Sequence, residues 1–135
     1  MRIPALVAVA LSLAAPAHSG DPAAGERLWR QCQACHMIVD GGGNVIQQGG
    51  RDGPNLYGII GSRAASVAGF RYSAELSEAR DMGLVWDQAR FVDYVTNPTG
   101  FLRRFLDRPS ARSPMGFQMR AGAADMFAYL RSVAR

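Results

Sequence analysis

The sequence predicts an all-α fold of about four to five short helices joined by long loops. No segment shows the alternation of apolar and polar residues that is typical of a half-buried strand, whereas several segments repeat apolar residues every three to four positions. Fifteen glycines and seven prolines among 135 residues favour loops over one long helical bundle. Apolar residues make up 48% of the chain, which is enough for one sizeable core.

Residues 1–19 have the pattern of an export signal. One arginine precedes a short apolar stretch, and small residues precede Gly20. The apolar stretch is too short to span a bilayer comfortably, although an uncleaved anchor is the alternative. We expect cleavage between Ser19 and Gly20, with cleavage after Ala17 as the second choice, and a single domain over residues 20–135 in the periplasm.

Charge is distributed unevenly along the expected mature chain. All fifteen basic residues of the sequence are arginine. Residues 20–100 hold seven arginines and nine acidic residues, whereas residues 101–135 hold seven arginines and two acidic residues. This imbalance predicts a basic face built from the last third of the chain. No basic run is long enough to indicate nucleic-acid binding.

The first helix is predicted to begin at Asp21-Pro22, where a capping side chain precedes a proline suited to the first helical position. Leu28, Cys32 and Cys35 follow at helical spacing, so we expect this helix to carry both cysteines. Residues 40–55 contain six glycines and are predicted to form a loop.

Four further helices are predicted in the second half of the chain. A short helix is expected over residues 73–81, and a second over residues 88–97 that a proline ends. A third short helix is expected over residues 99–106. An irregular, arginine-rich strap over residues 108–120 then leads to a last helix over residues 123–133.

The pentapeptide Cys32-Gln33-Ala34-Cys35-His36 is the attachment signal for c-type haem. Its two thiols can form thioethers with the haem vinyl groups, and the next residue offers an imidazole to the iron. A redox dithiol would require a βαβ setting that the sequence does not predict. A zinc site would need further ligands, and the only other histidine, His18, lies in the export signal. A structural disulfide would leave His36 unexplained. The motif therefore predicts one covalently bound haem.

An iron bound by His36 has a second axial position, which a methionine, a water molecule or nothing can fill. Met115 is our first candidate because it lies in the irregular strap, where the backbone is free to bring a thioether to the iron. Met119 of the same strap is the second candidate. The other methionines stand beside the attachment site or in or just after predicted helices: Met37, Met82 and Met126.

An ordered series of short motifs runs through the expected mature chain. It consists of Gly25, Cys32-x-x-Cys35-His36, Gly53-Pro54-Asn55-Leu56, Gly69-Phe70-x-Tyr72, Trp86, Tyr94, Asn97-Pro98, Met115-x-Phe117 and Ala128-Tyr129-Leu130. In this order the series resembles the class I c-type cytochromes, both mitochondrial cytochrome c and the bacterial long-loop cytochrome c2 type. The resemblance implies the cytochrome c fold, in which short helices and long loops wrap around one covalently attached haem.

The resemblance also implies roles for individual residues. His36 is similar to the proximal iron ligand, and Pro54 to the proline whose carbonyl accepts the second N–H of the imidazole. Met115 is similar to the distal ligand, and Tyr94 to the tyrosine that reaches its sulfur. Phe117 falls at the exposed haem edge. The residues that fall near the haem propionates are Tyr72, Ser73, Trp86 and Ser113, and plain core filling is the alternative for Tyr72 and Tyr94.

Two further sets of residues follow from the resemblance. The positions where the first and last helices cross are Gly25, Trp29, Met126 and Tyr129. The chain departs from the family at Ser62, where an arginine near a propionate is usual, and Arg63 follows one position later.

A histidine–methionine pair leaves the iron no open site, so the expected function is electron transfer rather than catalysis. We expect a soluble, monomeric periplasmic shuttle between a cytochrome bc1-type donor and a terminal oxidase, reaction centre or reductase. The alternative is a haem enzyme or gas-binding sensor with an open sixth coordination site. Membrane complexes with acidic docking surfaces are the expected partners, and the expected docking residues are Arg103, Arg104, Arg108, Arg112 and Arg120.

Overall fold

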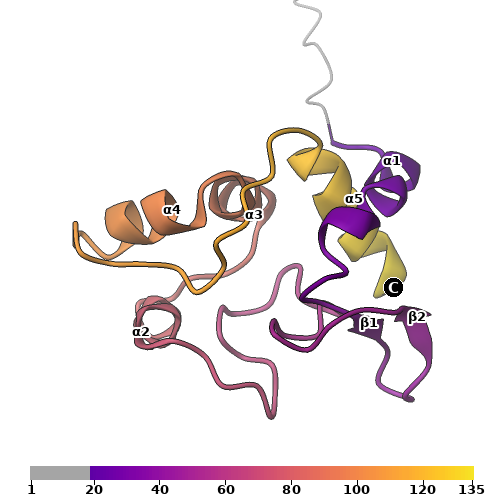
Figure 1. The fold of residues 1–135 in the computed structure, drawn as a ribbon, viewed down its shortest axis with the longest axis horizontal. Helices are drawn as coiled ribbons and strands as arrows, with labels where there is room; N and C mark the ends of the chain where they lie inside the picture. The colour runs from indigo at the N-terminus through magenta and orange to yellow at the C-terminus, as the bar shows by residue number, and fades with distance from the viewer. Residues whose placement is uncertain (1–18) are drawn as a thin grey trace, which may run out of the picture.

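Five short α-helices and one β-hairpin form the part of the chain that the computed structural model describes, residues 19–135 (Figure 1). The helices are α1 (Pro22–Arg27), α2 (Ala74–Asp81), α3 (Gln88–Thr96), α4 (Pro98–Phe105) and α5 (Ala123–Val133). The hairpin strands are β1 (Ile38–Val39) and β2 (Val45–Gln47). Except for Ser19, the expected export signal lies outside the described residues. None of the described helices has the length and apolar character needed to cross a membrane.

Helix α1 is shorter than predicted and does not carry the cysteines. Asp21 caps it by accepting a 3.0 Å hydrogen bond from the amide of Ala23, but the helix ends at Arg27 and a single 3-10 turn (Trp29–Gln31) follows. Cys32 and Cys35 lie in the turn after it. The carbonyl of Cys35 accepts a 2.7 Å hydrogen bond from the amide of Gly53, so a distant loop takes the acceptor that a continuing helix would need.

The expectation of a loop without strands over residues 40–55 is also wrong in part. Strands β1 and β2 pair antiparallel, with Ile38 opposite Gln47. The side chain of Asp40 closes the turn, because its Oδ1 accepts hydrogen bonds from the amides of Gly42 at 2.8 Å and Asn44 at 2.9 Å. Strands of two and three residues are too short to show an alternating pattern in the sequence.

The predictions for α2, α3, α4 and α5 are confirmed to within about two residues. Helix α2 begins after Ser73, whose hydroxyl accepts a hydrogen bond from the amide of Leu76 at 3.2 Å. Helix α3 begins after Asp87, which accepts from the amide of Arg90 at 2.9 Å. The strap over residues 108–120 contains no helix or strand, as expected.

Helices α1 and α5 cross in close contact at one side of the molecule (Figure 1). A β-carbon at Gly25 would overlap the carbonyl oxygen of Asp125 and stand 2.6 Å from the β-carbon of Tyr129. Trp29, Met126 and Tyr129 are buried beside this contact. The crossing expected from the resemblance is therefore present, and it requires glycine at position 25.

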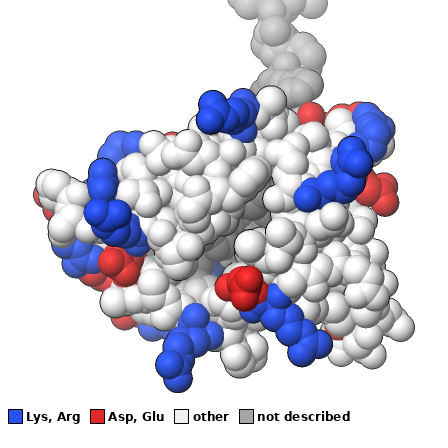
Figure 2. All heavy atoms as spheres, in the orientation of Figure 1, with Lys and Arg blue, Asp and Glu red and all other residues white. Residues whose placement is uncertain are grey.

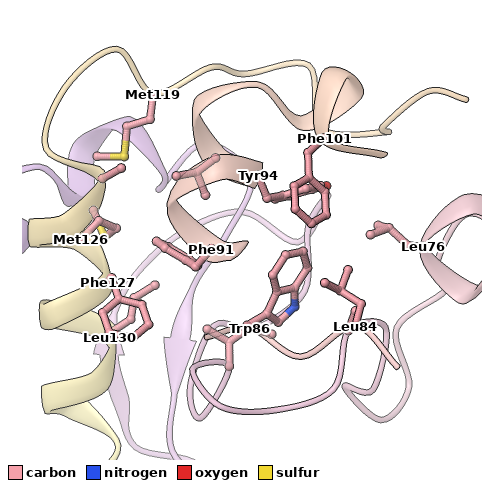
Figure 3. Close-up of a cluster of buried hydrophobic side chains, with 14 of the residues drawn as sticks. Leu76, Leu84, Trp86, Phe91, Tyr94, Phe101, Met119, Met126, Phe127 and Leu130 are labelled. Carbon is pink, nitrogen blue, oxygen red and sulfur yellow. The ribbon is translucent and has the colours of Figure 1, made fainter. Parts of the chain in front are cut away.

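The core joins this crossing to α3 (Figure 3). Phe91 of α3 packs against Phe127 of α5, with ring centroids 5.8 Å apart. On the other side, Trp86 packs against Tyr94 with centroids 4.8 Å apart, and Tyr94 meets Phe101 of α4 edge-on at 5.7 Å. Helix α3 thus fixes the positions of both α4 and α5.

Candidate haem-binding site

A cavity of about 320 Å³ lies between α3, the strap and the turn that carries the cysteines. Figure 2 shows the surface hollowed near the middle of the molecule. Cys32, Cys35, His36 and Met115 all line this cavity. Much of the remaining lining is apolar: Leu56, Ile59, Leu76, Phe91, Val95 and Leu130. The structure therefore brings together the residues that the motif and the resemblance select as haem ligands.

The turn that bears the cysteines is held by the glycine-rich loop that follows it. The amide of Gly50 donates to the carbonyl of Gln33 at 2.8 Å, beside the bond from Gly53 to Cys35. A β-carbon at Gly49 or Gly50 would overlap backbone atoms of the turn. Sequence reasoning assigned no role to Gly49 and Gly50, although their clustering after the motif was the available signal.

The imidazole of His36 is oriented by the carbonyl of Pro54, 2.8 Å from its Nδ1. A carbonyl can only accept, so Nδ1 carries the proton and Nε2 keeps its lone pair. Burial lowers the pKa of His36, and the bond to Pro54 opposes part of this shift. A neutral imidazole with its second nitrogen fixed by a carbonyl is the form in which histidine binds metals.

Before a haem is attached, burial keeps the Cys32 sulfur in its thiol form. Burial, with a smaller effect from the neighbouring Cys35, raises the pKa of Cys32 to about 11. Cys32 is partly buried and Cys35 exposed, and both are free thiols. The two sulfur atoms are not bridged to each other, which leaves both for thioether bonds to a haem.

Met115 is half-buried in the strap, and its backbone is tied to Ser113. Its amide donates to the hydroxyl of Ser113 at 3.1 Å, and that hydroxyl is also bonded to the hydroxyl of Tyr94 at 2.8 Å. The resemblance places the Tyr94 hydroxyl at the methionine sulfur, whereas in this structure its hydrogen-bond partner is Ser113. Burial raises the pKa of Tyr94, which keeps this hydroxyl protonated.

Two other methionines also line the cavity. Met119 of the strap is only 2% exposed, and its amide donates to the carbonyl of Val95 in α3 at 2.7 Å. Met126 of α5 is equally buried. Neither Met37 nor Met82 lines the cavity. The cavity lining therefore reduces the candidates for the second axial ligand from five methionines to three, Met115, Met119 and Met126.

The four residues expected near the propionates divide into two groups. Tyr72, Ser73 and Trp86 line the cavity, but Ser113 does not. The Tyr72 hydroxyl accepts from the amide of Val67 at 3.2 Å, so its own hydrogen remains available to donate. Phe117 also lines the cavity and is 41% exposed.

Two charged residues line the cavity, Asp52 and Arg71. Arg63 lies elsewhere, because its guanidinium donates to the carbonyl of Arg80 at 3.1 Å. The hydroxyl of Ser62 donates to the carbonyl of Ile59 at 2.7 Å. Sequence reasoning missed Arg71, although its place between the lining aromatics Phe70 and Tyr72 was a signal.

The donor set and the lining fit a covalently bound haem. Two thiols, an oriented neutral imidazole and thioethers meet in one largely apolar cavity, a chemistry that suits an iron porphyrin. Charged side chains occur only at Asp52 and Arg71 among its lining residues. The cavity thus combines apolar walls with few polar groups, as is usual for cofactor sites.

Comparisons with known proteins agree with this site. No family model matches the chain. Cytochrome c-551 of Roseobacter denitrificans is 47% identical over 95% of this chain and 91% of its own length. Cytochrome c2 of Cereibacter sphaeroides is 41% identical over 98% of this chain and 96% of its own length. The structure of cytochrome c2 from Rhodobacter capsulatus superposes with a TM-score of 0.83 at 35% identity, over 86% of this chain and all of that one. The chain therefore belongs to the class I c-type cytochromes, monohaem electron carriers with one covalently bound haem c.

Proposed function

We propose that this protein carries single electrons in the periplasm between larger membrane redox complexes. The donor is a complex of the cytochrome bc1 type, and the acceptor is a terminal oxidase, a reaction centre or a reductase. The observation that carries the proposal is the meeting of Cys32, Cys35, His36 and Met115 in one apolar cavity. When bound, the haem supplies an iron that takes up and returns one electron.

Cys32 and Cys35 would hold the haem through thioethers, and His36 and Met115 would bind its iron. A thioether ligand favours the reduced iron and raises the reduction potential. The apolar walls act in the same direction, because they disfavour the additional positive charge of the oxidised state. Pro54 keeps the imidazole in place through its 2.8 Å hydrogen bond.

Arginines beside the cavity support electrostatic docking to acidic partners. Arg71 lines the cavity, and Arg27 and Arg120 line an adjoining groove that shares Gln31 and Phe117 with it. Within residues 19–135, these three arginines form no ion pair. Figure 2 shows basic side chains on several sides of the hollow. We propose that Arg27, Arg71 and Arg120 form the docking face.

The other arginines that the sequence suggests for docking differ in whether their guanidinium groups already form bonds within the protein. Arg104 pairs with Asp93 and Arg108 with Glu78, both at 2.8 Å. Arg103 donates through Nε to a backbone carbonyl at 3.1 Å. These bonds compete with a partner's carboxylates, whereas Arg112 forms no ion pair with a described residue. We propose that Arg112 is a peripheral docking residue. We also propose that the protein acts as a monomer.

We propose that the protein is exported and cleaved after Ser19, and the packing of Gly20 is compatible with a mature chain that starts there. A β-carbon at Gly20 would overlap the carbonyl oxygen of Ala124, and the amide of Asp21 donates to the carboxylate of Asp125 at 2.8 Å. Gly20 and Asp21, which directly follow the expected cleavage site, are therefore already packed against α5. Intact-mass measurement of protein from the periplasm should give a chain starting at Gly20 plus one haem, and a chain that keeps residues 1–19 would contradict the proposal.

Electron exchange with membranes tests the shuttle function. Oxidised protein is mixed with membrane vesicles that contain a quinol-oxidising complex, and its reduction is followed by absorbance. We expect second-order reduction that an inhibitor of that complex abolishes. Failure of several such membranes to reduce or oxidise the protein would contradict the shuttle function.

A further inference from the structure

Ser113, two residues before Met115, forms hydrogen bonds to two different helices. Its amide donates to the hydroxyl oxygen of Thr99, in the first turn of α4, at 3.0 Å. Its own hydroxyl accepts from the amide of Met115 at 3.1 Å and is bonded to Tyr94 of α3 at 2.8 Å. The backbone of Met115 is thus connected through Ser113 to both α3 and α4.

The hydrogen bond between Thr99 and Ser113 joins the two ends of the chain segment over residues 100–112. Other contacts of this segment include the ion pairs of Arg104 and Arg108, whose side chains are 59% and 40% exposed. Exposed ion pairs contribute only about 0–1 kcal/mol each. Ala111 is buried and its carbonyl accepts from Arg103, and the Thr99 bond is the next anchor along the strap, two residues before Met115.

From this geometry we propose that Thr99 is a positioning residue for the sixth iron ligand. Its hydroxyl holds Ser113, and through Ser113 it slows the departure of the Met115 thioether from the iron. The inference rests on the proposed role of Met115 as that ligand. Without the hydroxyl, the partly buried amide of Ser113 loses its acceptor, and the bond to Tyr94 remains as the hydrogen bond between Ser113 and a helix.

A second threonine provides a matched control. The hydroxyl of Thr96 donates to the carbonyl of Val92 at 2.7 Å, within its own helix α3, and the residue is exposed. Thr96→Val and Thr99→Val each replace a hydroxyl by a methyl group. Only Thr99→Val removes a hydrogen bond to the strap. Thr99→Ser keeps the hydroxyl and serves as the rescue variant.

Imidazole binding to the oxidised, haem-loaded protein measures how fast the thioether leaves. If imidazole binds only after the thioether has dissociated, the rate at saturating imidazole equals the dissociation rate. We expect Thr99→Val to raise this limiting rate about three- to tenfold, the range that one hydrogen bond of ordinary net strength supports. Thr96→Val and Thr99→Ser should keep the wild-type rate.

The sulfur-to-iron charge-transfer band is recorded for every variant before mixing. Equal limiting rates for wild type and Thr99→Val would overturn the inference while leaving Met115 as the ligand. Failure of Thr99→Ser to restore the wild-type rate would also overturn it. A wild-type protein that lacks the band would contradict ligation by Met115 itself, and the role of Thr99 with it.

Discussion

Gly53 lies against the imidazole ring of His36, so close that a β-carbon at position 53 would stand 2.6 Å from the Nδ1 atom. The same Nδ1 donates to the carbonyl of Pro54, the residue that follows Gly53. Any side chain at position 53 would therefore push on the ring and on its hydrogen-bond acceptor together. The absence of a side chain at Gly53 is a requirement of the ligand geometry.

Gly53→Ala should destabilise the haem-loaded protein by about 1–3 kcal/mol, the usual cost of overpacking a tight site. Gly41→Ala is the matched control, since a β-carbon there meets nothing within 4 Å. Denaturant unfolding of both variants measures the difference. Equal unfolding free energies would show that the ring and the loop can shift without cost.

Met115→Ala should abolish the sulfur-to-iron charge-transfer band and allow CO to bind the reduced protein. Met119→Ala should keep the band and exclude CO, although it should cost about 2–5 kcal/mol of stability because Met119 is buried. Visible spectra with and without CO separate the two variants. The opposite pattern would transfer the ligand assignment to Met119.

Charge reversal beside the cavity should slow electron transfer to an acidic partner. Arg27→Glu combined with Arg120→Glu should lower the second-order rate about tenfold or more at low ionic strength, because steering depends on charge near the contact. Salt that shortens the Debye length to about 10 Å should reduce this difference. The visible spectrum should not change.

Two double variants locate the docking face. Arg131→Glu with Arg135→Glu makes the same change in net charge at residues that line neither the cavity nor the groove, and it should have a smaller effect. Arg103→Glu with Arg104→Glu tests the face expected from the sequence alone. A larger loss of rate in this variant than in Arg27→Glu with Arg120→Glu would move the docking face to α4.

Stability should fall at alkaline pH through tyrosines that are buried or partly buried. Burial raises the pKa of Tyr72, Tyr94 and Tyr129 above the ordinary value of 10.0, so the unfolded chain ionises first. Their contribution is therefore complete below pH 10 and is lost as the pH rises through the folded-state pKa values. The sequence holds no lysine that would titrate in the same window.

Tyr94→Phe isolates one of these tyrosines. The variant should lose about 1 kcal/mol at neutral pH with the bond to Ser113, and its stability should then fall less steeply than wild type above pH 10. Unfolding free energies at several alkaline pH values provide the comparison. Parallel curves for the two proteins would show that Tyr94 does not contribute to the alkaline loss.

The parts of the fold that the sequence predicts well depend on local interactions. Ser73 and Asp87 cap α2 and α3 through amides only three residues away, so their signals are readable from the chain itself. The haem motif is likewise local, since its chemistry lies within five consecutive residues. Apolar residues at helical spacing likewise predict that α5 extends to Val133.

The parts that the sequence does not predict depend on distant partners. Helix α1 ends before the cysteines, and the turn that bears them is bonded to Gly50 and Gly53, a pairing that no local signal shows. The ion pairs of Arg104 and Arg108 join different helices or loops, so counting arginines could not show which ones are engaged. Register and charge pairing of this kind require the structure.

The function as an electron carrier depends on a closed sixth coordination position. Reduced wild-type protein at neutral pH is exposed to CO, and the visible spectrum is recorded before and after. With His36 and Met115 both bound to the iron, the spectrum should remain unchanged. An immediate spectral shift to a CO complex would show an open site, and it would identify the protein as a gas-binding or catalytic haem protein instead.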